Sequence, residues 1–304
     1  MKAVRIHAYG DVDQLIYEDA PDPKPGPGEL LVKQMATSIN PIDWKVLSGA
    51  MQQFIPITFP HILGHDVAGV VKEVGDGVTE FKSGDRVIAV GGATYAELVV
   101  VPAKNAAVIP RALDCGDGAA LPLVTTTGIQ LIDEAIVPKS GEKVLVTGAL
   151  GGVGRSAMYA AKLAGATVTA GVRKSEFVEA EELHANHLLA LDDERDQGNR
   201  GPFDAVADTV GPKVTEKLLP YVRAAGRLVT VVDLPPNVGQ FPQVKCSMFQ
   251  MHPDGKRLAE TAIDVVAKKW GLRIPIDRRL PLAQARRGLD AARKGGIGKV
   301  LLLP

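Results

Sequence analysis

The sequence predicts an α/β protein in two parts, a β-barrel-like domain followed by a doubly wound parallel sheet. Three observations lead to this prediction. The first third of the 304 residues consists of short strand-like runs separated by Gly- and Pro-containing turns. From about Thr125 onward, predicted strands and helices alternate, which is typical of a parallel sheet. The length suits two domains of ordinary size.

Short strands are expected throughout the first part. They are predicted at residues 1–6, 30–33, 66–74, 86–90 and 96–101. A proline-rich loop at 21–28 must be mostly extended, because proline fixes φ and removes a hydrogen-bond donor. Frequent turns between short strands indicate a compact barrel-like domain.

In the second part, the pattern changes from short strands to strands that alternate with helices. Strands are predicted at residues 143–147, 167–172, 187–191, 205–208 and 226–232. Helices are predicted between them at 153–164 and 175–183, the first ending before Gly165. The final segment, 282–304, holds an Ala/Arg-rich helix and a terminal strand at 299–303.

A glycine-rich loop joins the strand at 143–147 to its helix. It reads GALGGVG over residues 148–154, so that Ala149, Gly151 and Gly154 align with G-x-G-x-x-G and Gly152 and Val153 lie between them. Gly151 would let the backbone approach a pyrophosphate at the helix N-terminus, and Gly154 would allow close helix–strand packing. The loop predicts a dinucleotide site; the alternative is a turn without a ligand.

The tip of the next strand indicates which dinucleotide binds. An NAD site usually places an acidic residue there for the ribose hydroxyls, but the sequence has Arg173, Lys174 and Ser175. These side chains could neutralise and hydrogen-bond a 2′-phosphate. We therefore predict NADPH, the alternative being two cations that are simply solvated.

Composition excludes several classes of protein. Lys and Arg total 35, as do Asp and Glu, so the basic excess of a nucleic-acid binder is missing. No apolar run approaches the roughly 20 residues that span a bilayer, and no signal peptide is expected. Cys115 and Cys246 are the only cysteines, which fits a reducing compartment. We expect a cytoplasmic protein.

Several longer stretches together resemble one family. They are INPIDWKVLSG (39–49), LGHDVAGVVKEVG (63–75), GDRV (84–87), GGATYAELVVVPA (91–103), FDAVADTVG (203–211), GRLVTV (226–231) and GKVLLL (298–303). In order and spacing they resemble the medium-chain dehydrogenase/reductase superfamily, and within it the zinc-independent quinone oxidoreductases. The resemblance implies a GroES-like domain at 1–123, completed by 272–304, and a Rossmann domain at 124–271. It also implies a homodimer, for which residues 243–249 could supply the joining strand.

The same resemblance bears on zinc. In zinc-dependent relatives the first ligand would align with Asn40, the second matches His65, and the third falls near Leu123. A catalytic zinc needs three protein ligands, so we expect no metal here. The four-cysteine structural lobe is also missing. His65 is then expected to serve as a hydrogen-bonding residue near the active-site cleft, the alternative being a role in packing only.

Without a Lewis acid, the chemistry should favour substrates that accept hydride easily, namely quinones and activated α,β-unsaturated carbonyls. We assign Asn40 to polarising a substrate oxygen and Lys45 to electrostatic stabilisation or proton donation. Asp43 is expected to orient Lys45. The alternative is a polar cluster that only braces the loop.

Further residues are expected around the cofactor and substrate. Thr126 and Thr127 resemble the family's nicotinamide contacts. Lys299 matches a position near the cofactor, the alternative being a solvated lysine at a strand edge. Val232 lies at a strand end of the kind that binds ligands in open sheets. An apolar pocket could be lined by Trp44, Phe54 and Phe241, although core packing is the alternative for each.

The sequence thus predicts an NADPH-dependent reductase of quinones or activated enones. An alkenal/enone double-bond reductase remains an alternative within the same class. A non-catalytic NADPH-binding protein with a structural or regulatory role is an alternative of another class.

Overall fold

The computed structural model describes residues 1–193 and 201–304, and the chain divides into two units. Unit 1 comprises Met1–Leu123, Pro253–Val266 and Ile274–Pro304, and unit 2 comprises Val124–His252 and Ala267–Arg273. The first division falls after residue 123, where the sequence placed it. Residues 253–266 group with unit 1, however, although the sequence-based division put all of 124–271 in the second domain.

The close packing of α6 (Gly255–Val266) explains this difference. Helix α6 contacts β8 (Ala106–Val108). A Cβ on Gly255 would lie 2.4 Å from the carbonyl oxygen of Ala106, so only glycine allows this approach. The sequence of the helix alone does not indicate that contact.

Two sheets form unit 1. The larger, seven-stranded sheet has the order β15-β16-β3-β5-β6-β8, and β7 pairs with β3 outside this path. Its strands are β3 (Glu29–Ser38), β5 (Asp66–Val74), β6 (Arg86–Val90), β7 (Leu98–Pro102), β8, β15 (Ile276–Pro281) and β16 (Lys299–Leu303). The smaller sheet has the order β2-β1-β4, with β1 (Lys2–Ile6), β2 (Ile16–Asp19) and β4 (His61–Ile62).

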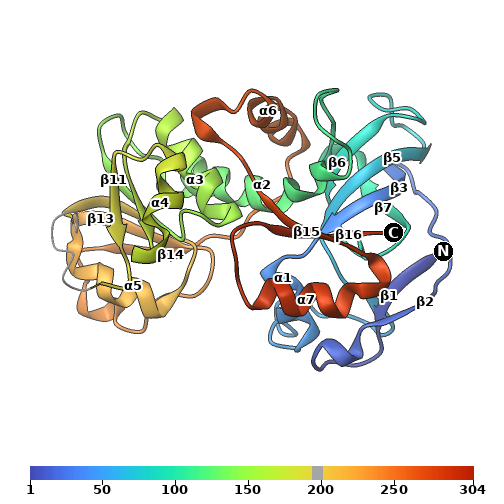
Figure 1. Ribbon diagram of the computed structural model, residues 1–304, viewed down its shortest axis with the longest axis horizontal. Helices are drawn as coiled ribbons and strands as arrows, with labels where there is room; N and C mark the ends of the chain where they lie inside the picture. Colours follow the sequence, from blue (N-terminus) through green and yellow to red (C-terminus); the bar gives the residue numbers. More distant parts are fainter. Residues whose placement is uncertain (194–200) are drawn as a thin grey trace. The chain divides into compact units, whose positions relative to one another are not determined.

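Strand β3 brings the two ends of the chain together. It pairs antiparallel with β5, β7 and the C-terminal strand β16, and Figure 1 shows the red β16 beside the blue β3. At the end of β3 the backbone N–H of Ile39 donates to the carbonyl of Val300 at 3.0 Å. The loop from β3 into α1 (Pro41–Leu47) is therefore held against β16.

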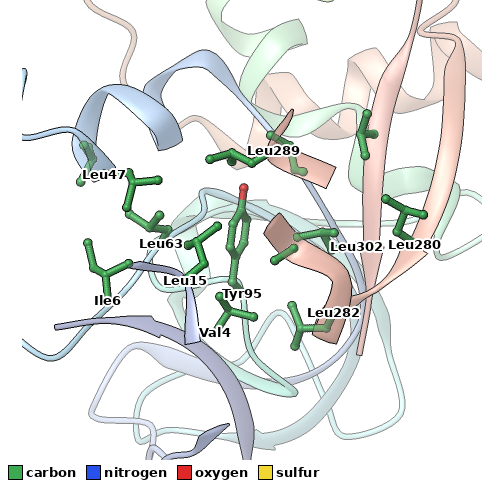
Figure 2. Close-up of a cluster of buried hydrophobic side chains, with 14 residues drawn as sticks. Val4, Ile6, Leu15, Leu47, Leu63, Tyr95, Leu280, Leu282, Leu289 and Leu302 are labelled. Carbon is green, nitrogen blue, oxygen red and sulfur yellow. The ribbon is translucent and has the colours of Figure 1, made fainter. Parts of the chain in front are cut away.

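A hydrophobic cluster fills the space between these elements. Leu47 of α1, Leu289 of α7 (Ala285–Arg293) and Leu302 of β16 are all fully buried in it. Figure 2 shows the ring of Tyr95 enclosed by such aliphatic side chains. Each fully buried leucine contributes about 1.5–3 kcal/mol, so residues from both ends of the sequence stabilise unit 1.

Unit 2 is a six-stranded parallel sheet with the order β11-β10-β9-β12-β13-β14. The strands are β9 (Lys143–Thr147), β10 (Thr167–Val172), β11 (His187–Ala190), β12 (Phe203–Asp208), β13 (Val222–Thr230) and β14 (Lys245–Met248). The first strand, β9, is central, and the order reverses between β9 and β12. This is the doubly wound Rossmann topology, which binds dinucleotides where the order reverses.

The helices of unit 2 follow the expected alternation with one exception. Helix α2 (Pro122–Gln130) leads into the π-helical stretch Leu131–Ile136, α3 (Gly152–Leu163) follows β9, and α5 (Pro212–Leu218) follows β12. The helix predicted at 175–183 is instead three short helical pieces, of which α4 (Phe177–Ala180) is the α-helical one. No helix in the described part of the chain combines the length and apolar character needed to span a membrane.

Candidate active site

Asn40 lies at the junction between β3 and α1, as the N-cap of that helix. Pro41 follows at the first helical position, and Asp43 stands at the third. The backbone N–H of Asn40 donates to Asp43 Oδ2 at 2.8 Å. The sequence Asn-Pro-x-Asp is typical of a helix start, so the local sequence fixes both polar side chains at one corner of unit 1.

Asp66, the first residue of β5, is the central acceptor of a buried network. Its Oδ2 accepts from Asn40 Nδ2 at 2.6 Å and from the hydroxyl of Ser38. Its Oδ1 accepts from the backbone N–H of Leu123 at 2.7 Å. These side chains of Asp66, Asn40 and Ser38 are all buried, and each carboxylate oxygen has a donor.

Lys299 completes this network from β16. Its Nζ donates to Asn40 Oδ1 at 2.5 Å and to the carbonyl of Ile39 at 2.8 Å, and it lies 3.9 Å from Asp66 Oδ2. Burial lowers the pKa of Lys299, and the charges of Asp66 and Asp43 offset this only in part. The ammonium of Lys299 thus has its hydrogen-bond partners inside unit 1, and it is buried rather than solvated at a strand edge.

Asp43 holds His65 and Tyr95. Asp43 Oδ1 lies 3.0 Å from His65 Nδ1, and Asp43 Oδ2 accepts from the Tyr95 hydroxyl at 2.8 Å. Asp43 and Tyr95 are fully buried, whereas the His65 side chain is 28% exposed. We call this group of Asp43, His65 and Tyr95 the histidine cluster.

Electrostatics set the protonation of this cluster. Desolvation lowers the pKa of His65, but the hydrogen bond to Asp43 and the charges of Asp43 and Asp66 outweigh it, so the pKa is raised. Burial and the neighbouring carboxylates raise the pKa of Tyr95 well above its ordinary value. The tyrosine therefore stays a hydrogen-bond donor to Asp43.

These contacts change two of the predicted roles. Asp43 does not orient Lys45, because residues two apart on a helix face different directions and both Asp43 oxygens have other partners. Lys45 is partly exposed and has no ion pair within the described ranges. The Asn40 side chain, 1% exposed, donates to Asp66 and to the Ser38 carbonyl, so its amide is used within the protein.

The residues at the aligned zinc positions do not fit a catalytic metal. Leu123 carries no ligand atom, and the oxygens of Asp66 already accept three hydrogen bonds. Asn40 faces the ammonium of Lys299, a neighbour that disfavours a second cation. Within residues 1–193 and 201–304 there is no group of three or more His, Cys, Asp or Glu side chains that could hold a metal ion.

The glycine loop in unit 2 has the geometry of a phosphate cradle. Gly151 is the N-cap of α3, and the first N–H groups of a helix have no partner within it. A Cβ on Gly154 would lie 2.1 Å from the carbonyl oxygen of Gly148, whereas one on Gly151 would meet that oxygen at 3.3 Å. Gly154 is therefore required for packing. At Gly151 a Cβ would be in tight contact with that one atom only, so the loop of Ala149, Gly152 and Val153 is less crowded there than at Gly154.

Helix α2 packs against this loop. Cβ atoms on Gly128 and Gly152 would lie 2.3 Å from the carbonyl of Val153 and 3.0 Å from Val124, respectively. Thr126 lies between Val124 and Gly128 on α2, and its buried hydroxyl has no hydrogen-bond partner in the described structure. A buried, unsatisfied hydroxyl is costly, so Thr126 fits a site that a polar ligand completes. Thr127 is buried beside it.

The charged residues after β10 are exposed and weakly paired. Arg173 is 68% exposed and 3.0 Å from Glu176, and Lys174 is 65% exposed and 2.7 Å from Asp193. Ser175 is exposed too. Exposed ion pairs contribute at most about 1 kcal/mol, so both cations are available to exchange a carboxylate for a phosphate.

Sequence reasoning missed Asp208, which ties together the carboxyl ends of three strands. Its carboxylate accepts from Thr147 at 2.7 Å and from Thr230 at 2.6 Å. The backbone N–H groups of Val210 and Gly211 also donate to it. Val232 follows at the same sheet edge, its N–H donating to the Thr230 hydroxyl. This edge is where open parallel sheets bind ligands.

The three predicted pocket aromatics do not share one environment. Trp44 packs at the margin of the unit 1 cluster, and Phe241 packs against the core of unit 2. Phe54 is 78% exposed. A hollow of about 320 Å³ in unit 1 is lined by residues around Arg5, Pro21 and Ile62 and by none of these aromatics. Packing accounts for Trp44 and Phe241.

Comparisons with known proteins cover the whole chain. The family described as "Alcohol dehydrogenase GroES-like domain" matches residues 26–111, and the family "Zinc-binding dehydrogenase" matches 144–302. The chain is 32% identical to the chloroplast envelope quinone oxidoreductase homolog of Arabidopsis thaliana, covering 100% of this chain and 98% of that protein. It is 30% identical to a quinone oxidoreductase of Pseudomonas aeruginosa, covering 100% and 99%.

The chain is also similar to solved structures over its whole length. The quinone oxidoreductase from Coxiella burnetii matches with a TM-score of 0.89 and 26% identity, over 100% of this chain and 99% of that one. A mycobacterial protein complexed with NADPH matches with a TM-score of 0.86 and 27% identity over all of both chains. An NAD-dependent alcohol dehydrogenase matches with a TM-score of 0.88 and 28% identity, again over all of both chains.

Proposed function

Because the chain belongs to the medium-chain dehydrogenase/reductase superfamily, on its quinone oxidoreductase-like branch, we propose that it is a zinc-free reductase of quinones or activated α,β-unsaturated carbonyls, with NADPH as its cofactor. The observation that carries the zinc-free assignment is the Asp66 network. Asn40, Ser38 and Leu123 satisfy the carboxylate internally, and Lys299 supplies the neutralising cation.

Residues of unit 2 would hold the cofactor. A bound reduced nicotinamide would supply the hydride. Gly151 and the first N–H groups of α3 would bind the pyrophosphate, as such loops do at helix N-termini. The unpartnered hydroxyl of Thr126 would hydrogen-bond the nicotinamide end, with Thr127 and Val232 beside it.

Arg173, Lys174 and Ser175 support NADPH over NADH. Their exposure leaves room for a phosphate, and a charge-assisted hydrogen bond contributes about 1.5–3 kcal/mol. The NADPH-bound mycobacterial relative is consistent with this proposal. Glu176, which also lies beside Arg173, would have to turn away from the phosphate.

The substrate class follows from the groups that unit 1 offers. Hydride transfer to a quinone or an enone creates an oxyanion whose charge is delocalised, so hydrogen-bond donors and single cations suffice to stabilise it. An alcohol would need an alkoxide, for which the family's zinc-dependent members use a Lewis acid. Lys45, partly exposed on α1, remains a candidate for electrostatic stabilisation.

We also propose a homodimer that forms through β14. This strand is at the edge of the sheet and pairs only with β13 within the described part of unit 2. An unpaired strand edge is a template for a second copy. Light scattering should give the dimer mass. The N–H of Phe249 donates to Thr230 of β13, so the N–H of Met248 faces the free edge, and Met248→Pro, which removes that donor, should weaken the dimer. A monomer at micromolar concentration would contradict this assembly.

The test is NADPH oxidation by chelator-treated protein with 1,4-benzoquinone, a naphthoquinone, methyl vinyl ketone and a simple aldehyde, repeated with NADH. We expect turnover that resists the chelator, and an Arg173→Ala/Lys174→Ala variant should raise the KM for NADPH at least about tenfold while leaving that for NADH alone. Arg278→Ala, an exposed cation in unit 1, is the control.

Other outcomes favour the alternatives. A strong preference for methyl vinyl ketone over both quinones would favour an alkenal/enone double-bond reductase. NADPH binding without turnover of any acceptor would favour a non-catalytic, structural or regulatory role. Loss of activity on chelation and its return with zinc would overturn the zinc-free assignment.

A further inference from the structure

The proposed reaction requires a proton as well as a hydride. Hydride addition to a quinone forms one bond to hydrogen and leaves an oxyanion, which becomes the hydroquinone when it takes up one proton. An enone follows the same balance, because its enolate must be protonated to give the saturated ketone. One NADPH and one proton are consumed for each acceptor reduced, so a group of the protein or water must deliver the proton.

We propose that His65 is this proton donor and that Asp43 and Tyr95 position it, an inference that rests on the proposed function. Among the ionisable side chains of the buried network, His65 alone reaches solvent. Its side chain is 28% exposed, whereas Asp43, Asp66, Tyr95 and Lys299 are buried.

Asp43 fixes the orientation of the imidazole. It faces Nδ1 at 3.0 Å, so Nδ1 carries the proton that is shared with the carboxylate. Nε2 is left as the nitrogen that can give or take a proton at the open side of the ring. A carboxylate in this position orients an imidazole and stabilises its protonated form.

The carboxylate is itself held in place. Asp43 Oδ2 accepts from the Tyr95 hydroxyl and from the Asn40 backbone N–H, both at 2.8 Å. It also occupies the third position of α1, whose start is fixed by Pro41. By contrast, Lys45 has no hydrogen bond in the described structure to hold its flexible side chain. A proton donor must be positioned to be effective, which favours His65 over Lys45.

The charges around His65 favour its protonated form. Asp43 and Asp66 face it with negative charge, and they outweigh the desolvation of the ring. Lys299, 3.9 Å from Asp66, neutralises part of that charge, and His61 is close enough that its own pKa is lowered by burial and by His65. After its Nε2 proton has gone to the product oxyanion, the neutral ring can regain one from water.

The main test uses His65→Asn with matched controls. The asparagine amide can still donate to Asp43 in place of Nδ1–H, but nothing replaces Nε2. We expect the rate with methyl vinyl ketone, whose enolate is strongly basic, to fall about 100-fold. With a quinone bearing electron-withdrawing groups, whose reduced anion is weakly basic, the loss should be at least about tenfold smaller. His61→Asn is the control histidine, and Lys45→Met tests the rival donor.

The pH profile gives a second readout. In the wild type, kcat/KM with the enone should fall as pH rises through the raised pKa of His65. That fall should be absent in His65→Asn and unchanged in His61→Asn. Tyr95→Phe removes one donor from Asp43 and strengthens its hold on the imidazolium, so the fall should move to higher pH. A residue with only a structural role would not move it.

Three results would overturn the proposal. They are an equal rate loss for both acceptors in His65→Asn, a pH-dependent fall that persists in that variant, and a larger enone-specific loss in Lys45→Met. Histidine NMR of the free protein is independent of turnover: we expect the Nδ1–H tautomer and a raised pKa for His65, and the Nε2–H tautomer would contradict the inferred geometry. If the wild type reduces no acceptor, the proposed function fails first, and His65 has no such reaction to serve.

Discussion

Replacing Asp66 by asparagine removes the negative charge around which the buried network of unit 1 is arranged. The variant keeps one oxygen, which can still accept from the Leu123 N–H. It places an NH₂ group where Oδ2 now accepts from Asn40 and Ser38. It also leaves the buried ammonium of Lys299 without the carboxylate 3.9 Å away.

The expected cost is large because a buried charge loses its partner. Breaking a buried ion pair by removing one side costs about 3–5 kcal/mol, a substantial share of the roughly 5–15 kcal/mol that stabilises a domain. Lys299→Met alone should cost less, about 1–3 kcal/mol. It removes the cation beside Asp66 and the two hydrogen bonds that Nζ donates, but three donors still hold the Asp66 carboxylate.

A double-mutant cycle isolates the interaction. In Asp66→Asn/Lys299→Met no buried charge is left unpaired, so the double variant should be about 1–3 kcal/mol more stable than the sum of the two single effects predicts. Unfolding in urea can be followed in unit 1 alone, because Trp44 lies in unit 1 and Trp270 in unit 2. A Trp270→Phe background makes Trp44 the only tryptophan.

Two results would contradict the role assigned to the interaction between Asp66 and Lys299. A loss below about 1 kcal/mol in Asp66→Asn would mean that the carboxylate is not the main stabiliser of the network. Additive single effects would mean that Lys299 and Asp66 do not interact. In either case the packing of β16 against β3, rather than the polar network, would hold the loop at Asn40.

Three further predictions concern other parts of the molecule. Gly154→Ala should destabilise unit 2 by about 1–3 kcal/mol through overpacking, whereas Gly151→Ala should leave the melting temperature nearly unchanged and weaken NADPH binding in calorimetry. Burial lowers the pKa of Lys162 from 10.5 to about 8. Between these two pH values the unfolded chain binds more protons than the folded one, so the free energy of unfolding measured in urea should rise from pH 8 to pH 10. Lys162→Met should remove that rise. The pKa of His65 is raised above the ordinary 6.5. The stability that this adds should be fully present below pH 6.5 and should be lost as pH rises through the raised pKa. Urea titrations of His65→Asn should not show this loss.

The strands followed from sequence wherever the signal is local. The predicted bounds of 66–74, 86–90, 143–147, 167–172 and 299–303 are those of β5, β6, β9, β10 and β16. Alternating or continuous apolar runs between turn residues determine such elements by themselves. The piecewise helix at 174–183 shows the limit, because short segments depend on tertiary contacts more than on propensity.

The site was predicted less completely, because its contacts join distant parts of the chain. Asn40 and Asp43 could be singled out through the family resemblance, because they lie in the loop that would hold the first zinc ligand in zinc-dependent relatives. Their partners could not: Lys299 lies 259 residues from Asn40, and Tyr95 lies 52 residues from Asp43. Asp43 contacts His65, 22 residues away, rather than Lys45, and no spacing within residues 40–45 reveals that contact.

The position of β16 between β15 and β3 also has a consequence for the order in which the protein acquires its structure during synthesis. The first 123 residues leave the ribosome long before residues 276–303, which supply two strands of their sheet and part of their hydrophobic cluster. The parallel sheet of unit 2, by contrast, is complete once residue 248 has emerged. Although its sequence comes later, unit 2 should therefore mature first. In the nascent unit 1, β3 can already pair with β5 and β7, but its end at Thr37 and Ser38 waits for β16 and stays exposed to chaperones until then.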